Sequence, residues 1–291
     1  MISSLSSLGQ LSKKAAAPPS NFDGVNAVWS TKLRISTYTG ACLKLRRSSD
    51  GTIADFYADA SGNLGTALGA TGTSYSSWKG AATTSVVTWY DQSGKSNDTT
   101  QSIDAYQPIY SDINGVTFNG STTYLQGSIY SATLNTENFT IISSATNLNT
   151  GSYGSIISSR LVTAGLLRGY TLYKVDTNTW YLQFGKNATT WGDFITNVAA
   201  TTGIRYILAF NQNKLTNILS SSIKNTSTSA VSNNTVNSTG YTPSTGNITT
   251  RIGAGTTETF AQYFFDGYIN DLFYFGKSLS TTEQTNVSNL L

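Results

Sequence analysis

Two sets of residues in this sequence have types and positions suited to ligand binding, and the first could hold a metal ion. Asp91, Asn97 and Asp98 lie within one short stretch, around the turn residues Ser93 and Gly94. Carboxylate and amide oxygens are the ligands that Ca²⁺ prefers, so these three are a candidate calcium site. The alternative is that they cap a turn by hydrogen bonding to their own backbone, as Asp and Asn often do.

The second set is aromatic and could bind a sugar. Trp78, Trp191 and Tyr241 stand beside Ser, Thr and Gly residues that are typical of turns. A ring exposed there can stack on a sugar, while nearby Asn and Gln side chains bond its hydroxyl groups. The alternative is burial in the core, which we expect for Trp89 and Trp180 because these lie in strand-like runs. We therefore predict carbohydrate binding at Trp78, Trp191 and Tyr241.

The composition removes several other kinds of chemistry. The chain has 291 residues, with no His and a single Cys, Cys42. A Ser-His-Asp triad, a His-ligated zinc site and imidazole acid–base catalysis are thereby excluded. An intramolecular disulfide and a cysteine-based metal cluster are excluded as well. Catalysis would have to use carboxylates, Tyr, Lys or Ser, and we expect no cofactor unless calcium binds.

Charge is scarce and unevenly distributed. Charged residues make up 11% of the chain, against about 25% in an ordinary soluble domain. Hydrophobic residues make up 38% and aromatic residues 12%, which is enough to build a core. The first 50 residues hold seven basic groups against two acidic ones. We expect these basic groups to be solvated side chains, and we do not expect a nucleic-acid partner.

Residues 1–20 are predicted to be an arm and linker. Leucines at every third position would place one apolar stripe on a short helix, and Pro18-Pro19 would end a helix or a strand. The candidate docking residues are Leu5, Leu8, Leu11, Lys13 and Lys14; the alternative is a frayed terminus. The segment lacks the basic-then-apolar order of a secretory signal. The chain has no stretch of about twenty apolar residues, so we expect no membrane association.

Residues 21–291 are expected to form one all-β domain. Short apolar runs follow one another from residue 42 to residue 275, separated by Gly, Asn and Ser turns, which is typical of a sandwich or barrel. We expect a short helix with a basic face over residues 25–37. A second helix is expected over residues 281–291, where Ser280-Thr-Thr-Glu283 fits a capping box. Residues 225–250 are predicted to be a long surface loop or weakly patterned edge hairpins.

Several motifs carry a resemblance to a known family. Tyr38-Thr-Gly40, Arg46-Arg-Ser-Ser-Asp-Gly51 and Tyr90-Asp-Gln-Ser-Gly94 occur in that order, and this resembles the start of the catalytic domain of fungal alpha-L-arabinofuranosidase B. Residues 264–283 and 116–125 are similar to the final strand with its short helix, and to an early strand, of laminin-G-like lectins. The resemblance implies a concanavalin-A-like jelly-roll β-sandwich, here with short N-terminal and C-terminal helices.

The resemblance also implies where catalytic carboxylates would stand. Retaining glycosidases use one carboxylate as nucleophile and one as acid–base, about 5–5.5 Å apart. When residues 189–192 set the register, the nucleophile falls near Tyr181. When residues 252–255 set it, the acid–base position falls near Gly255, with Glu258 three residues further on. Neither position holds a carboxylate, so hydrolysis is not expected.

Three functions are compatible with this sequence. We predict a non-enzymatic virion structural protein, a capsid decoration, minor capsid or fibre component whose arm docks on other virion proteins. Its basis is the low-charge, Ser/Thr/Asn-rich composition and the resemblance to domains found in phage and large-virus structural proteins. The first alternative is a secreted carbohydrate-binding adhesion module that attaches to surface glycans. The second, a retaining arabinofuranosidase, is disfavoured because its carboxylate pair is missing.

Overall fold

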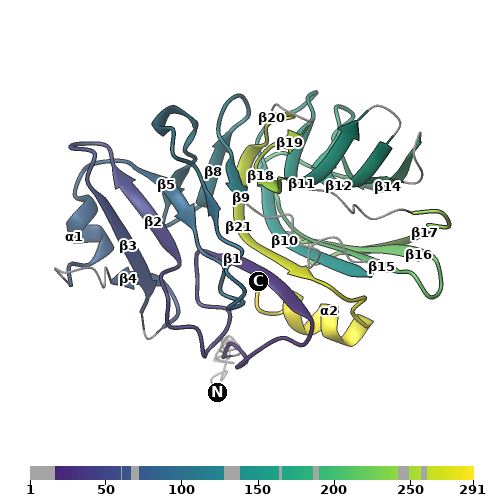
Figure 1. The fold of residues 1–291 in the computed structure, drawn as a ribbon, viewed down its shortest axis with the longest axis horizontal. Coiled ribbons are helices and arrows are strands. Elements are labelled where there is room, and N and C mark those ends of the chain that lie inside the picture. The colour runs from purple at the N-terminus through teal and green to yellow at the C-terminus, as the bar shows by residue number, and fades with distance from the viewer. Residues whose placement is uncertain are drawn as a thin grey trace, which may run out of the picture.

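Antiparallel strands dominate the part of the chain that the computed structural model describes. The described residues are 17–59, 61–66, 72–127, 138–163, 166–185, 190–241, 249–256 and 261–291. Figure 1 shows two layers of strands on one side of the molecule, with β11, β12 and β14 in one layer and β10, β15, β16 and β17 in the other. The all-β sandwich predicted from the spacing of apolar runs is therefore confirmed.

One layer, here called the front sheet, crosses the whole molecule. In hydrogen-bonded order it contains β4 (Leu64–Thr66), β3 (Ile53–Ala58), β2 (Leu43–Arg47), β5 (Thr84–Trp89), β6 (Thr99–Thr100), β9 (Leu125–Gly127), β18 (Arg251–Ile252), β11 (Gly154–Thr163), β12 (Leu166–Lys174), β13 (Thr179–Gly185) and β14 (Trp191–Ala199). Every one of these pairings is antiparallel, so directly paired residues share a face of the sheet.

The other layer, the back sheet, is shorter. It contains β7 (Ile109–Ser111), β8 (Gly115–Asn119), β21 (Asp266–Phe275), β10 (Phe139–Asn147), β15 (Arg205–Asn213), β16 (Ile218–Asn225) and β17 (Val231–Asn237), with β1 (Val25–Ser30) also paired to β21. A pairing of β7 with β5 joins the two layers. Strands β19 (Gly255–Thr256) and β20 (Ala261–Gln262) form a separate small hairpin.

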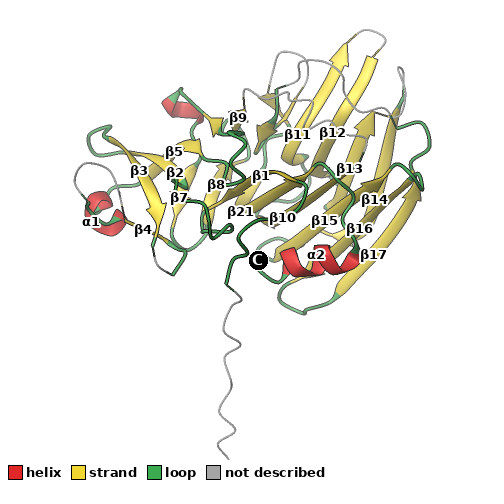
Figure 2. Cartoon of the chain, turned by 60° about the horizontal axis from the view of Figure 1, so that its bottom comes forward, coloured by secondary structure: helices red, strands yellow, loops and turns green. Residues whose placement is uncertain are grey.

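Alternate side chains of both layers fill the space between them. Trp180 and Leu182 from the front sheet and Leu208 and Phe210 from the back sheet are almost completely buried there. A second apolar cluster lies on the outer side of the back sheet, where the helix α2 (Thr281–Ser288) covers it (Figure 2). Two smaller helical segments, α1 (Tyr75–Lys79) and the 3₁₀ turn η1 (Asp104–Tyr106), lie in connections.

The helix expected over residues 25–37 is wrong, because residues 25–30 form strand β1. Val25 and Val28 pack into the cluster beneath α2, whereas Ala27 and Trp29 pack into the main core. A strand buried on both faces shows no alternation of apolar and polar residues. Its apolar residues therefore do not recur at every second position, and their spacing resembles that of a short helix.

The C-terminal helix is confirmed, with its predicted cap. The Oγ of Ser280 accepts a hydrogen bond from the backbone N–H of Glu283, and the Glu283 carboxylate accepts one from the N–H of Ser280. The helix ends at Ser288, three residues earlier than predicted. Within residues 225–250, β17 forms an edge hairpin with β16. This agrees with the second of the two predicted alternatives, edge hairpins.

The remaining expectations from the sequence concern the N-terminal arm and membrane association. The proposed docking residues Leu5, Leu8, Leu11, Lys13 and Lys14 lie outside the described residues. Neither described helix is long and apolar enough to span a bilayer.

Candidate functional site

Trp191 lies beside a guanidinium group on the outer surface of the front sheet. The Cζ atom of Arg160 is 4.4 Å from the centroid of the Trp191 ring. Arg160 is on β11 and Trp191 on β14, so three strand spacings of about 4.8 Å separate their backbones. Their pairing partners on the two strands between are Gly169 on β12 and Gly185 on β13. Because neither glycine has a side chain, Arg160 and Trp191 can lean toward each other across the sheet.

The first of these glycines cannot be replaced without a clash. Gly169 has a φ of +79°, in the left-handed region that favours glycine. A Cβ atom at this position would lie 1.6 Å from the carbonyl oxygen of Ser159. The backbone of β11 and β12 thus requires glycine here, and the contact between Arg160 and Trp191 follows from it.

Four tyrosines lie next to this pair. Tyr173 on β12 and Tyr181 on β13 are paired residues whose ring centroids are 5.2 Å apart. Tyr153 stacks on Tyr173 at 6.1 Å, and Tyr263 lies 5.3 Å from Tyr153. The rings of Tyr153 and Tyr263 belong to residues that are 40% and 37% exposed, whereas Tyr173 is only 7% exposed. The exposed Tyr153 ring therefore rests on the buried Tyr173, and the exposed Tyr263 ring lies beside Tyr153.

Polar and charged groups complete the surface. Burial lowers the pKa of Arg160, although the neighbouring Tyr263 and Tyr173 act in the opposite direction. Asp193 accepts a 2.9 Å hydrogen bond from Nε2 of Gln183. Burial raises the pKa of Tyr181, and both the charge of Asp193 and a hydrogen bond to it raise it further. We call this surface the Arg160 face; it consists of Tyr153, Arg160, Tyr173, Tyr181, Gln183, Trp191, Asp193 and Tyr263.

Of the three aromatic residues predicted to bind sugar, only Trp191 belongs to the Arg160 face. The expectation of an exposed ring at Tyr241 is wrong, because Tyr241 is 3% exposed and packs in the core against Phe184 at 5.3 Å. Trp78 is half-buried at another part of the fold, against Phe56 and beneath the guanidinium of Arg47. Trp89 and Trp180 are fully buried, as predicted.

Asp91, Asn97 and Asp98 hold a loop together. The two carboxylate oxygens of Asp91 accept hydrogen bonds from the backbone N–H groups of Val28, Ser93 and Asn97 and from the Ser93 hydroxyl. The carboxylate of Asp98 accepts one from the N–H of Asp91. This is the turn-capping alternative, and it also ties the loop to β1. In the described part of the chain, no group of three or more His, Cys, Asp or Glu side chains could hold a metal ion.

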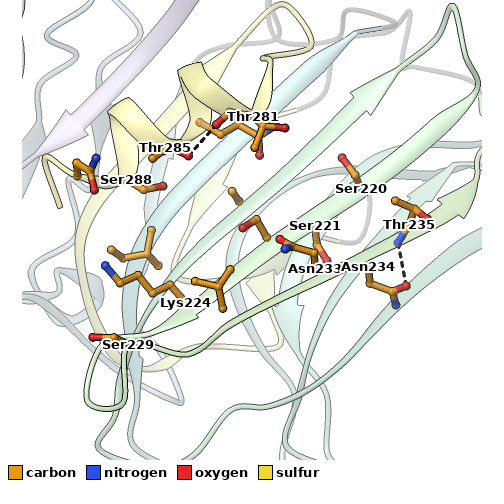
Figure 3. Close-up of a pocket in the computed structure, with 16 residues that line it drawn as sticks. Ser220, Ser221, Lys224, Ser229, Asn233, Asn234, Thr235, Thr281, Thr285 and Ser288 are labelled. Carbon is orange, nitrogen blue, oxygen red and sulfur yellow. Dashed lines mark hydrogen bonds between the residues drawn. The ribbon is translucent and has the colours of Figure 1, made fainter.

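A groove of about 470 Å³ lies on the outer side of the back sheet, between α2 and strands β15 to β17. Figure 3 shows hydroxyl and amide side chains along both of its walls, among them Ser220, Thr235 and Thr285. Among the described residues that line it, Lys224 is the charged one and none is aromatic. The groove offers hydrogen bonds but no ring on which a sugar could stack, so we place the candidate site on the Arg160 face.

The two positions that the family resemblance assigns to catalysis lie beside the same tyrosine cluster. Tyr181 is part of it, and a Cβ atom added to Gly255 would lie 3.1 Å from the ring of Tyr263. Neither position holds a carboxylate, but Asp193 stands on the strand next to Tyr181. Tyr181, Gln183 and Asp193 were not predicted from the sequence as ligand-binding residues. Their alternation with buried residues along β13 and β14 is the pattern that could have placed them on the outer face of the sheet. Glu258 lies outside the described residues.

Comparison with known proteins shows the fold. No protein-family model and no curated protein matches the chain. Among solved structures, a GH54 a-l-arabinofuranosidase soaked with a cyclic sulfate inhibitor is similar with a TM-score of 0.60 and 12% identity. An arabinofuranosidase complexed with arabinofuranosyl-alpha-1,2-xylobiose is similar with a TM-score of 0.59 and 14% identity.

The extent of each match differs. The arabinofuranosidases match over 91% of this chain, which spans only 62% and 61% of their own lengths. A sialidase CBM40 of Ruminococcus gnavus bound to alpha2,3 sialyllactose matches over 54% of this chain and 85% of its own, with a TM-score of 0.45 and 15% identity. This chain therefore shares the lectin-like β-sandwich of the arabinofuranosidase structures.

Proposed function

We propose that this chain binds carbohydrate through the Arg160 face and does not hydrolyse it. The observation that carries the proposal is the contact of Arg160 with Trp191, next to a cluster of tyrosines on the same sheet surface. Aromatic rings present flat apolar faces with polar edges. Guanidinium, carboxylate and amide groups, here from Arg160, Asp193 and Gln183, can bond hydroxyl groups in defined directions.

Similarity of the fold to a sugar-bound structure also supports the proposal. One of the similar solved structures is an arabinofuranosidase that holds an arabinofuranosyl-xylobiose. We infer that this chain takes a related ligand, a neutral oligosaccharide containing pentose units. Of the two positions that the resemblance assigns to sugar chemistry, Tyr181 belongs to the Arg160 face and Gly255 borders it at Tyr263.

The absence of hydrolysis is proposed on chemical grounds. A retaining glycosidase needs two carboxylates about 5–5.5 Å apart. Tyr181 and Gly255 cannot fill those two carboxylate roles, because neither side chain is a carboxylic acid. Asp193 supplies one carboxylate beside Tyr181. A second described carboxylate, Asp176, bonds to Tyr153 of the same face. We propose that Asp193 and Asp176 bond sugar hydroxyl groups and do not act as a nucleophile and acid–base pair.

A matched pair of tryptophan variants tests the binding site. Trp191→Ala is expected to weaken binding to arabinoxylan fragments about tenfold, since it removes the ring against which Arg160 packs. Trp78→Ala makes the same change at a half-buried Trp that also lies beneath an arginine, and it should leave affinity unchanged. Binding that is lost only in Trp78→Ala, or no binding to any glycan of an array, would overturn the proposal. Release of arabinose from an arabinofuranoside would overturn its non-hydrolytic part.

A role in a virion is our second proposal, and it rests on the sequence. The low charge and the leucine–lysine pattern of residues 1–20 support attachment of a polar domain to a particle. Deleting residues 1–16 keeps the hydrogen bonds that Pro19 and Ser20 accept from Ser36 and Thr37. This deletion should abolish incorporation into particles and leave the unfolding temperature of the domain unchanged. Unchanged incorporation would contradict the arm, and a freely secreted protein would contradict the location.

A further inference from the structure

One row of directly paired residues crosses the front sheet from β3 to β14, and every member of the row is polar. Across nine strand spacings of about 4.8 Å, it extends for about 43 Å along the sheet. In order, its members are Asp55, Lys44, Thr88, Thr100, Gln126, Arg251, Ser158, Thr171, Gln183 and Asp193. The row of polar side chains thus continues well beyond the Arg160 face, with Thr88, Arg251, Ser158 and Thr171 buried within it.

Three aromatic rings with a cation above them lie along this row. Each cation is within 6 Å of the ring centroid, the distance over which the ring attracts it. From β14 toward β2, the pairs are Trp191 with Arg160 at 4.4 Å, Tyr124 with Arg251 at 5.7 Å, and Tyr90 with Lys44 at 5.9 Å. The sheet therefore carries three aromatic platforms, spaced along one direction.

The two ends of the row repeat the same chemistry. At one end the hydroxyl of Tyr90 donates a 2.7 Å hydrogen bond to Asp55, whose carboxylate lies 3.8 Å from Nζ of Lys44. At the other end a hydrogen bond links Tyr181 to Asp193. Each end therefore presents a tyrosine ring beside a carboxylate, an arrangement that can stack on one sugar and bond its hydroxyl groups.

The part of the row on β11 and β12 is closed to a ligand. Ser158 and Thr171 are buried, and their hydroxyl oxygens lie 2.8 Å apart in a hydrogen bond. Thr100 and Asp193 are exposed, and Gln126 is partly exposed. A ligand that follows the row would touch its accessible members at the two ends and at Thr100 and Gln126 near the middle. Elsewhere it would touch the aromatic rings beside the row.

We propose that the ligand is an extended neutral polysaccharide that lies across the strands of the front sheet and contacts all three platforms. This inference rests on the proposed carbohydrate binding and adds the length and direction of the bound chain. The row and its platforms hold three cations, Lys44, Arg160 and Arg251, against the carboxylates of Asp55 and Asp193. One surplus positive charge is too little to neutralise the phosphates of a nucleic acid of the same length.

The test compares short and long ligands of one chemistry. Arabinoxylan and its oligosaccharides of two to ten units are titrated against the full chain by calorimetry. Affinity should rise with length, because contacts at linked platforms reinforce one another, and the polymer should bind about a hundredfold more tightly than the shortest fragment. Equal affinity for all lengths would overturn this inference and leave the proposed carbohydrate binding intact.

Platform variants separate the two proposals. Tyr90→Ala, at the end remote from Trp191, should weaken binding of the polymer about tenfold and leave the shortest fragment unaffected. Trp191→Ala should weaken both. Tyr90→Phe retains the ring and should retain most of the polymer affinity. Ile113 is 89% exposed and lies between β7 and β8, so Ile113→Ala is the control substitution and should leave the affinity for both ligands unchanged.

Three outcomes would overturn the inference. One is an unchanged polymer affinity in a Tyr90→Ala protein that unfolds at the normal temperature. If that variant fails to fold, an unchanged polymer affinity in Tyr124→Ala has the same force. The third is salt-sensitive binding of single-stranded oligonucleotides in preference to arabinoxylan, which would assign the platforms to nucleic acid. No binding of arabinoxylan or any other neutral glycan would remove both proposals together.

Discussion

Arg34 and Asp271 form a bidentate ion pair that ties the segment after β1 to β21. Nε and one terminal nitrogen of Arg34 donate to the two carboxylate oxygens at 2.7 and 2.9 Å. Asp271 is 2% exposed, and it also accepts a hydrogen bond from the Ser30 hydroxyl. A further terminal nitrogen of Arg34 donates to the carbonyl of Leu290. One arginine thus connects β1, β21 and the C-terminal end of the described chain.

Replacing this arginine should destabilise the fold strongly. Arg34→Ala leaves the buried Asp271 carboxylate without its cation, and loss of one partner of a buried pair costs about 3–5 kcal/mol. Urea unfolding measures the loss. Arg205→Ala is the control, since this exposed arginine also donates to a C-terminal carbonyl, that of Leu291, and its change should stay within about 0.5 kcal/mol. Equal losses in the two variants would contradict the importance of the pair.

Gly169→Ala should affect both stability and sugar binding. The strained φ alone costs about 1–3 kcal/mol, and the clash with the Ser159 carbonyl adds to it and displaces the strand that carries Arg160. Gly203→Ala is the matched control, because Gly203 has a φ of +78° but nothing within 4 Å of an added Cβ. A larger loss for Gly169→Ala in urea unfolding, with weaker glycan binding, is expected. Equal losses and unchanged binding would show that β11 and β12 can absorb the Cβ.

The capping box of α2 predicts a dependence of stability on pH. A hydrogen bond from Lys277, then bonds from Ser280, lower the pKa of Glu283 to about 2. A carboxyl group whose pKa is lowered by folding stabilises the protein above its unfolded pKa of about 4.3 and loses that contribution as the pH falls toward 2. The group is substantially exposed, so the contribution should be only a few tenths of a kcal/mol.

The Glu283→Gln variant provides the measurement. Its difference in unfolding free energy from the unaltered protein should shrink between pH 4.3 and about 2, because the neutral amide does not titrate. Asp112→Asn, a change at the turn between β7 and β8, serves as the control for general effects of charge removal. A difference that grows on acidification would have the wrong sign and would refute the assignment.

Calcium is expected to leave this protein unchanged. Four donors of the protein already occupy the carboxylate oxygens of Asp91, so a cation would have to displace them. Added Ca²⁺ or EDTA should therefore not shift the unfolding temperature, since a ligand raises stability only if it binds the folded state. Asp91→Ala, by contrast, should cost several kcal/mol through unsatisfied buried donors. A rise of the unfolding temperature with Ca²⁺ that disappears in Asp91→Ala would establish a calcium site.

The features predicted correctly from the sequence are those set by neighbouring residues. Ser280 and Glu283 are three positions apart, so their mutual capping can be predicted from the local sequence. The sandwich follows from short apolar runs bounded by turn residues, a pattern that each segment carries by itself. Trp180 and Trp89 were predicted to be buried because their own segments have strand character.

The features that were missed depend on distant pairing. Arg160 and Trp191 meet across two strands on which the residues paired with them, Gly169 and Gly185, have no side chains. The register between strands does not appear in a single sequence. Tyr241 is flanked by turn residues, yet its ring enters the core beside Phe184. Local composition indicates where the backbone turns, but it does not indicate which way the side chain then points.

The pairing of β1 with β21 has a consequence for the newly made chain. Val25 pairs with Phe275, at the opposite end of the described sequence. Ribosomes add about 5–20 residues per second, so the partner of β1 emerges about 12 to 50 s later. During that time β1, apolar on both faces, has no native strand beside it. The nascent polypeptide is therefore the form most exposed to aggregation, and it is the form on which a chaperone would act.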